Sequence, residues 1–351
     1  MYFLNSFYGL YSNAYLYPIN LRELKKTTNK PIDIVIAWVD GDDPVLKKKR
    51  DQFMDKKSGY TNPNAALTRF RSLNEVEFCV LSILRFAPFI RSIFIVTDGQ
   101  DPKVDNAVKK HFPKRLKDIR VVDHKEIFEG FESFLPTFNS ICISNMLWRI
   151  RGLSEHFVYF NDDIFITQTV HPQDWFVNDH PVIRGKWVLA PYERLLWDGL
   201  KKMFFPKKYG VLNASFQVNQ WNAASMLGFY GRYFRSGHTP LALKKSTLAN
   251  YFSAHQEVLK NNIAHRFRHY SQFNTVALAN HLEIKRGNPQ IRKSQAIYMQ
   301  PQKHNVDYVE KKMKQVVSED DKLFLCVQSL DMASYNVQNK VLNSLQALLK
   351  I

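Results

Sequence analysis

Four short apolar runs in the first half of the chain each lead directly into an acidic segment. The runs begin at residues 32, 92, 119 and 157, and the segments that follow contain Asp40, Asp98, Asp123 and the pair Asp162–Asp163. Such runs, bounded by turn residues, predict buried strands. The carboxyl ends of parallel strands share one edge of a sheet, where α/β proteins bind ligands. The sequence therefore predicts an acidic rim along that edge.

The most informative run, residues 157–166, is interrupted in its middle by Asn161, Asp162 and Asp163. Ionised carboxylates are costly to bury unless a partner or a metal offsets their lost hydration. Three adjacent oxygen ligands suit a hard divalent cation, Mg²⁺ or Mn²⁺. Taken alone, the pattern fits a strand followed by an Asx turn equally well. Because an acidic ending follows all four runs, we favour the metal site.

Helical patterns alternate with these predicted strands. Apolar residues recur at helical spacing over residues 73–84, before Pro88, and a second helix is expected over residues 140–151. This alternation predicts an α/β fold of the Rossmann-like (GT-A-like) kind, a mostly parallel sheet with helices on both faces. We expect a helical C-terminal half packed over the active-site edge, with helices at 241–260, 273–281 and 333–350 and a short strand at 322–327. Residues 171–237 give no clear pattern.

The 351 residues show no clear internal boundary after a short first segment. Residues 1–30 form an aromatic lead-in and a polar linker, and residues 31–351 are expected to form a single catalytic domain. Its first part, 31–170, would bind nucleotide and metal, and its second part, 171–351, acceptor and phosphate. The N-terminus lacks the basic start and cleavage pattern of a signal peptide, and no run reaches the length of a membrane span. A cytoplasmic location is therefore expected.

Cysteine content and charge limit the class of protein further. Cys79, Cys142 and Cys326 are widely spaced and lie among apolar residues, which favours burial over a disulfide framework or a zinc cluster. The net charge of +17 attracts anions such as nucleic acid, phosphoglycans or an acidic membrane surface. Nucleic acid is disfavoured, because no binding motif is recognisable and the acidic rim would repel a phosphate backbone. Together with the aromatic N-terminus, the charge suggests peripheral attachment to the inner face of the cytoplasmic membrane.

Two basic clusters in the second half complement the acidic rim. One contains His238 and is followed by Lys244 and Lys245; the other, residues 265–269, contains His265, Arg266 and Arg268. Histidine can accept a proton near neutral pH, and arginine binds phosphate oxygens in pairs. Plainer interpretations exist: His238 fits a turn cap, Phe267 fits the core, and Arg266 and Arg268 share a side only in an extended segment. Arg69 and Arg71 add two more candidate phosphate ligands.

These motifs resemble those of the Stealth family of sugar-phosphate transferases. That family includes bacterial capsular and exopolysaccharide phosphotransferases and the eukaryotic N-acetylglucosamine-1-phosphotransferase. Its four regions are matched in order by residues 32–44 (IDIVIAWVDGDDP), 69–102 extending to the string YFNDDIFI, 238–268, and 322–332 (KLFLCVQSLDM). The chain departs from the family pattern near Gln272, where members often carry an acidic residue, and near Asp331, where a second Asn-Asp-Asp is common. The roles of those two residues are open.

The resemblance implies transfer of a hexose-1-phosphate from a UDP-sugar to a hydroxyl of a glycan or polysaccharide, with an N-acetylhexosamine-1-phosphate favoured. The product would be a phosphodiester of a capsular polysaccharide or exopolysaccharide, and UMP would leave. The alternative is a GT-A-like, metal-dependent glycosyltransferase that releases UDP.

Residue roles follow from the same hypothesis. The turn at Asn161, Asp162 and Asp163 would bind Mg²⁺ or Mn²⁺. Nucleotide and phosphate binding would involve Asp40, Asp43, Asp98, Arg69 and Arg71. His265 is the first choice for the general base and His238 the second. The transferring phosphoryl group would be stabilised by Arg266 or Arg268.

Overall fold

The computed structural model describes residues 30–54, 73–205, 215–287 and 289–351. Its centre is a five-stranded sheet with the order β3-β2-β1-β4-β9. Four strands are parallel, β1 (Ile32–Ala37), β2 (Ile93–Thr97), β3 (Ile119–Asp123) and β4 (His156–Asn161), and β9 (Leu241–Lys244) runs antiparallel to β4. The prediction of a Rossmann-like, mostly parallel α/β sheet is confirmed.

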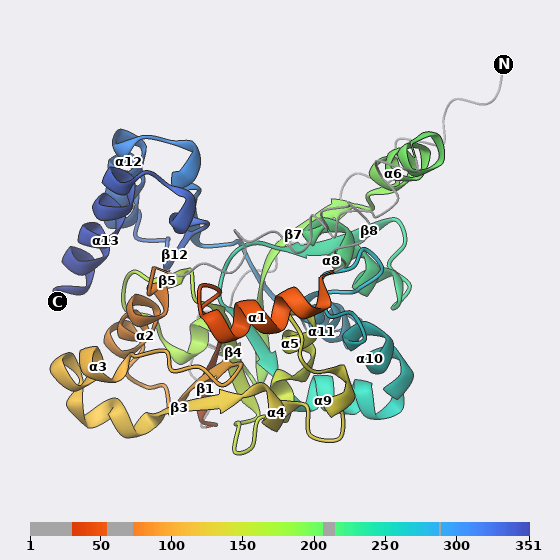
Figure 1. Ribbon diagram of the computed structural model, residues 1–351, viewed down its shortest axis with the longest axis horizontal. Helices are drawn as coiled ribbons and strands as arrows, with labels where there is room; N and C mark the ends of the chain where they lie inside the picture. Colours follow the sequence, from red (N-terminus) through yellow and green to blue (C-terminus); the bar gives the residue numbers. More distant parts are fainter. Residues whose placement is uncertain (1–29, 55–72, 206–214, 288) are drawn as a thin grey trace.

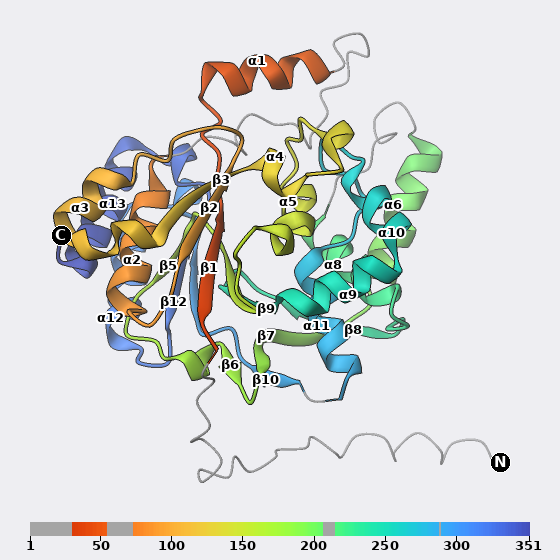
Figure 2. The ribbon, with the colours of Figure 1, turned by 90° about the horizontal axis from the view of Figure 1, so that it is seen from below.

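Helices cover both faces of this sheet, because alternate residues of each strand face opposite cores. Ile34 and Ile36 of β1 belong to one core and Val35 to the other. The first core includes α2 (Glu75–Phe86) and α13 (Tyr335–Leu349). The second includes α5 (Ser140–Met146), α9 (Lys245–Ala254), α10 (Gln256–Ile263) and α11 (Thr275–Lys285). Figure 2 shows the two groups of helices on opposite sides of β1.

The predicted run 157–166 contributes to two different sheets. After β4 the chain turns through Asp162 and Asp163 into β5 (Ile164–Ile166), which pairs antiparallel with β12 (Phe324–Val327). β12 also pairs in parallel with β11 (Ala296–Met299). Helix α12 (Val306–Ser318) packs against α13 beside this small sheet (Figure 1).

The segment that gave no clear pattern forms much of a third sheet. Strand β7 (His180–Leu189) pairs with β6 (Phe176–Val177), β8 (Arg232–Ser236) and β10 (Gln290–Arg292). Two helices of the same region, α6 (Tyr192–Phe204) and α8 (Phe216–Ser225), lie near this sheet (Figure 1). In the part of the chain that the structure describes, the remaining α-helices are α1 (Pro44–Phe53), α3 (Asp105–His111) and α4 (His124–Ile127).

Several predicted elements are confirmed and one is wrong. The helices expected at 273–281 and 333–350 are α11 and α13, the strand at 322–327 is β12, and the three cysteines are buried. The helix expected at 140–151 ends at Met146 and continues as a short 3₁₀ turn. The single helix expected at 241–260 is instead β9, α9 and α10, because residues 241–244 extend the central sheet beside β4. Helices α9 to α11 belong to the core on one face of that sheet.

Candidate active site

The turn between β4 and β5 holds Asn161, Asp162 and Asp163 at the carboxyl edge of the central sheet. Burial raises the pKa of both carboxyl groups, that of Asp163 to about 7. The charge of Asp163 raises the pKa of Asp162 further. Closely spaced carboxylates with raised pKa values lack a compensating positive charge, which a cation would supply.

Glu75 is a third carboxylate at this turn, and sequence reasoning missed it. It is the first residue of α2 and is buried, and its charge raises the pKa of both Asp162 and Asp163. Its Oε2 accepts a hydrogen bond from the Leu73 backbone N–H at 2.6 Å. An acidic residue in a first helical turn is usually explained by the helix dipole, so the sequence alone gives no reason to place it at the site.

The three carboxylates fit a divalent cation by their chemistry. Asp163 Oδ1 is buried and has no hydrogen-bond partner among the described residues. Its Oδ2 accepts a weak hydrogen bond from the Cys326 thiol at 3.7 Å. Such an unpaired buried oxygen is costly unless a ligand satisfies it. Within the described residues no three His, Cys, Asp or Glu side chains form a ready-made metal site. Mg²⁺ usually takes only one or two carboxylates from a protein and completes its shell with substrate oxygens and water.

Tyr159 connects this acidic turn to the basic half of the site. Its hydroxyl donates a hydrogen bond to Asn161 Oδ1 at 3.0 Å. Burial raises the pKa of Tyr159, the charge of Arg268 lowers it, and the charges of Asp162 and Asp163 raise it. The guanidinium and both carboxylates therefore lie within electrostatic reach of one phenol. Arg268 also donates to Ser140 Oγ at 2.6 Å.

Arg266 has different neighbours from Arg268, although the segment is not helical. It donates to the Pro136 carbonyl at 2.7 Å, and its guanidinium lies 4.4 Å from the ring centroid of Phe53 in α1. Phe267, between the two arginines, is half-buried and stacks on Phe138 with centroids 5.4 Å apart. Arg266 therefore joins α1 to the loop before α5. Arg268 is the arginine whose charge reaches Tyr159.

His238 lies between two aromatic rings, those of Phe216 at 5.3 Å and Tyr298 at 4.8 Å. Burial lowers the pKa of His238, which favours the neutral imidazole. The pKa of Tyr298 is raised by burial and by the charges of Cys326 and Asp163, so Tyr298 lies close to the acidic turn. Its hydroxyl donates to Gln328, which belongs to the fourth expected region. His238 is thus linked to the acidic turn through one aromatic ring.

His265 belongs to the same loop as Arg268. Its ring stacks on that of His269 with centroids 4.4 Å apart, and burial and the charge of His269 lower its pKa. A neutral imidazole can accept a proton from a hydroxyl. Within the described residues no direct contact joins His265 to the β4–β5 turn, so its role as base stays a prediction.

Gln272 organises this loop from within. Its side chain is buried. Its Oε1 accepts hydrogen bonds from Asn139 Nδ2 and from the His269 backbone N–H, both at 2.9 Å. Its Nε2 donates a hydrogen bond to the Asn262 carbonyl at 2.7 Å. Asn139 also donates to the His265 carbonyl at 2.9 Å. Gln272, at which the chain departs from the pattern of the Stealth family, therefore holds the His265–Arg268 segment in place.

The predicted nucleotide-binding acids lie at the same edge of the sheet and take part in local structure. Asp40 Oδ1 accepts a hydrogen bond from the Asp42 backbone N–H at 2.9 Å, Asp43 caps α1, and Asp98 pairs with Lys49 at 2.9 Å. Local bonds leave further acceptor capacity on a carboxylate, so nucleotide binding by these residues stays a prediction. Arg69 and Arg71 lie outside the described residues.

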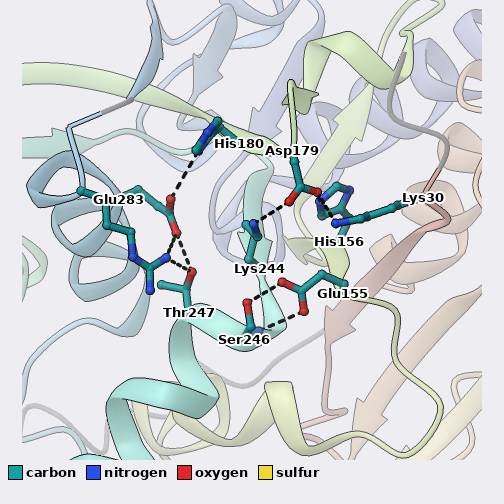
Figure 3. A network of polar contacts seen from close by, with 10 residues as sticks. Lys30, Glu155, His156, Asp179, His180, Lys244, Ser246, Thr247 and Glu283 are labelled. Carbon is teal, nitrogen blue, oxygen red and sulfur yellow. Dashed lines mark hydrogen bonds and ion pairs between the residues drawn. The ribbon is translucent and has the colours of Figure 1, made fainter. Parts of the chain in front are cut away.

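Lys244 does not join the site. In the β4–β9 register it lies opposite His156, at the amino end of β4, whereas Leu241 lies opposite Tyr159. Figure 3 shows Lys244 in a separate network, in which it donates to Asp179 at 3.0 Å. The expectation that the basic residues after His238 follow on a helix near it is therefore wrong for Lys244, because a strand carries this residue to the other end of the sheet.

Family models match two parts of the chain. The model for Stealth protein conserved region 1 matches residues 30–58, and the model for conserved region 2 matches residues 69–183. The first match contains the first region expected from the resemblance, and the second match contains the second region with the acidic turn. The third and fourth expected regions stay predictions.

Curated relatives are polysaccharide phosphotransferases. The chain is 40% identical over 149 residues to "Exopolysaccharide phosphotransferase SCO6023" of Streptomyces coelicolor, over 42% of this chain and 24% of that protein. It is 29% identical to "Capsular polysaccharide phosphotransferase WcwK" of Streptococcus pneumoniae, over 69% of this chain and 75% of the relative. The match thus spans about a quarter of the length of the Streptomyces relative.

Solved structures give a more distant likeness. A galactosyltransferase, LgtC, in complex with donor and acceptor sugar analogues overlaps 91% of this chain and 95% of its own at 12% identity, with a TM-score of 0.42.

Proposed function

We propose, from the premise that this chain carries conserved regions 1 and 2 of the Stealth family, that it transfers a hexose-1-phosphate from a UDP-sugar to a glycan hydroxyl. The observation that supports this most is that the charges of Arg268, Asp162 and Asp163 all act on the pKa of the buried Tyr159. Carboxylates that can hold a cation, next to a guanidinium, provide the charges that phosphoryl transfer requires. The names of the curated relatives agree with this class of reaction.

The reaction exchanges one phosphorus–oxygen bond for another. The acceptor oxygen attacks the phosphorus next to the sugar, the bond from that phosphorus to the UMP oxygen breaks, and UMP leaves with the electron pair. A neutral imidazole, His265 or His238, accepts the proton of the acceptor hydroxyl. Arg268 orients the phosphoryl group and stabilises the charge that builds on its oxygens. The anomeric configuration of the sugar is retained, because no bond to that carbon breaks.

A divalent cation would complete this site. Asp162, Asp163 and Asn161, with Glu75 beside them, are the residues that would hold Mg²⁺ or Mn²⁺. When bound, the cation would neutralise the phosphate oxygens of the donor. Asp40, Asp43 and Asp98 would lie at the nucleotide end. The identity of the metal, the UDP-sugar donor and a cytoplasmic location are parts of the proposal.

The products decide between this reaction and glycosyl transfer. The purified chain is incubated with a panel of UDP-sugars, including UDP-N-acetylhexosamines, a set of capsular oligosaccharide acceptors and Mg²⁺. Phosphodiester in the product by phosphorus NMR, together with UMP in the supernatant, is the expected result. A product without a phosphodiester resonance, accompanied by UDP, would assign the chain to the glycosyltransferase alternative.

The metal has its own prediction. Asp163→Asn removes a charge at almost constant volume and should lower turnover at least about a hundredfold, as loss of a charge-stabilising group does. Asp307→Asn, at an exposed position of α12, is the matched control and should leave turnover unchanged. Both variants should show wild-type circular dichroism. Full turnover in excess EDTA would contradict the metal assignment.

A further inference from the structure

Helix α6 projects from the body of the protein beyond β7 and β8 (Figure 1). None of its residues is buried. Leu196, Trp197, Met203 and Phe204 are between 60% and 67% exposed, and we call these four side chains the α6 face. A helix of a globular protein normally covers its apolar stripe. The described part of the chain leaves this face in contact with solvent.

The spacing of these residues makes α6 amphipathic. Leu196 and Met203 are seven residues apart, as are Trp197 and Phe204, so the four form two adjacent rows along one side. The polar side carries Arg194 and Asp198, whose side chains approach to 3.6 Å. The apolar rows can therefore enter an apolar phase while the polar side stays in water.

The charges around the α6 face point to an anionic partner. Apart from the buried Arg184, the helix and the adjoining strands carry more basic than acidic residues, namely Lys186, Arg194, Lys201, Lys202, Arg232 and Arg235 against Glu193 and Asp198. Lys201 Nζ lies 5.7 Å from the Trp197 ring centroid, and Arg232 lies 5.2 Å from that of Trp187. Aromatic rings beside basic groups are typical of helices at the surface of anionic bilayers. A second copy of this basic face would bring like charges together, which disfavours self-association.

We propose that α6 is an interfacial helix that inserts the α6 face into the surface of an anionic phospholipid bilayer. The helix lies in the interface and does not cross it: no described helix is long and apolar enough to span a membrane.

The position of α6 gives this contact a consequence for the site. Lys202 Nζ lies 6.0 Å from the Tyr270 ring centroid. The pKa of the neighbouring His269 is lowered mainly by burial and also by the charge of Lys202. The end of α6 is therefore adjacent to the loop that carries His265 and Arg268. Docking would bring that loop near the bilayer on the water side of the helix, which suits an acceptor hydroxyl on a lipid-anchored glycan that extends into water. This consequence rests on the proposed function, whereas the membrane contact does not.

Vesicle flotation with the purified full chain tests the contact without substrates. The vesicles are phosphatidylcholine alone or phosphatidylcholine with phosphatidylglycerol. The wild type should float with the anionic vesicles at low salt and less at high salt, where charge is screened. The variant Trp197→Ser/Phe204→Ser should reduce the bound fraction about tenfold, because it removes the two largest inserted rings. The control Val317→Ser/Tyr335→Ser changes two residues, one in α12 and one at the start of α13, that are each 75% exposed, and it should float like the wild type.

Three outcomes would overturn the proposal. The wild type fails to float with anionic vesicles at low salt, or the Trp197→Ser/Phe204→Ser variant floats as well as the wild type although circular dichroism shows it folded. Alternatively, sedimentation velocity reveals a dimer that this variant abolishes while vesicle binding persists, which would assign the α6 face to a second copy. None of these readouts uses turnover, so they are independent of the product test for the proposed function.

Discussion

At the scale of single residues, we expect Arg266 to serve stability and Arg268 to serve chemistry, although the two belong to one short string. Arg268→Ala should lower kcat/KM about a hundredfold to a thousandfold, because a charge-stabilising group near the acidic turn is lost. Arg266→Ala loses a cation–π contact and a hydrogen bond, and should lower the free energy of unfolding by about 1–2 kcal/mol with little effect on kcat. Steady-state kinetics and urea unfolding measure both. An equal loss of kcat in the two variants would contradict the division.

His124 predicts how stability changes with pH. Burial lowers the pKa of His124 from the usual 6.5 to about 4. The charges of Asp98 and Asp123 raise this pKa, and the charge of Lys49 lowers it further. The unfolded chain therefore binds the proton more readily, so the contribution of this residue to stability is complete above about pH 6.5 and is lost as the pH falls toward 4. A difference of about 2.5 pKa units corresponds to about 3 kcal/mol.

The variant His124→Gln removes this titration. Its melting temperature should fall less than that of the wild type between about pH 7 and pH 4.5. Other buried histidines, such as His281, have lowered pKa values and act in the same direction, so the comparison with the variant isolates the effect of His124. Parallel curves of melting temperature against pH would show that His124 does not contribute.

At the scale of elements, the loop between α10 and α11 depends on one amide. Gln272→Glu keeps both accepting contacts but replaces the donor to the Asn262 carbonyl with a carboxylate oxygen. Burying that unpaired group should cost about 1–3 kcal/mol. It should also raise KM for the acceptor, because the loop carries His265. Unfolding and acceptor titration check the two effects, and an unchanged melting temperature would mean that Gln272 is not the anchor of this loop.

The sequence predicts local elements better than their partners. Apolar runs identified β1 to β4, and the acidic interruption at Asp162 and Asp163 identified the turn, because both signals are local. That β5 leaves the central sheet depends on pairing with β12, far away in the chain, which no local pattern reveals. The role of Glu75 depends in the same way on which turn α2 meets. Residues 241–244 are too short for a periodicity to separate a strand from the start of a helix, and the position of Lys244 was missed for that reason.

At the scale of the whole molecule, the last segment of the chain belongs to the core of the first half. The Val327 backbone N–H donates to the Asp163 carbonyl at 2.9 Å, so β12 fixes the acidic turn directly. Helix α13 packs on α2, and its buried residues Val337, Val341, Leu345 and Leu349 share a core cluster with β1. The site is therefore assembled from residues at both ends of the expected catalytic domain.

A truncation after Ser318 tests whether residues 31–351 form one cooperative unit. It removes β12 and α13, and four buried aliphatic side chains alone are worth about 6–12 kcal/mol, which equals the whole stability of a typical domain. The truncated chain should lose its cooperative unfolding transition and bind a hydrophobic dye. Leu345→Ala is the milder comparison: it should lower the free energy of unfolding by about 2–5 kcal/mol and leave one transition. A truncated chain that unfolds at the wild-type urea midpoint would show that the C-terminal segment is a separate domain. Because Val327 of β12 bonds directly to Asp163, the truncation also removes a support of the acidic turn. Turnover should therefore disappear together with the cooperative unfolding transition.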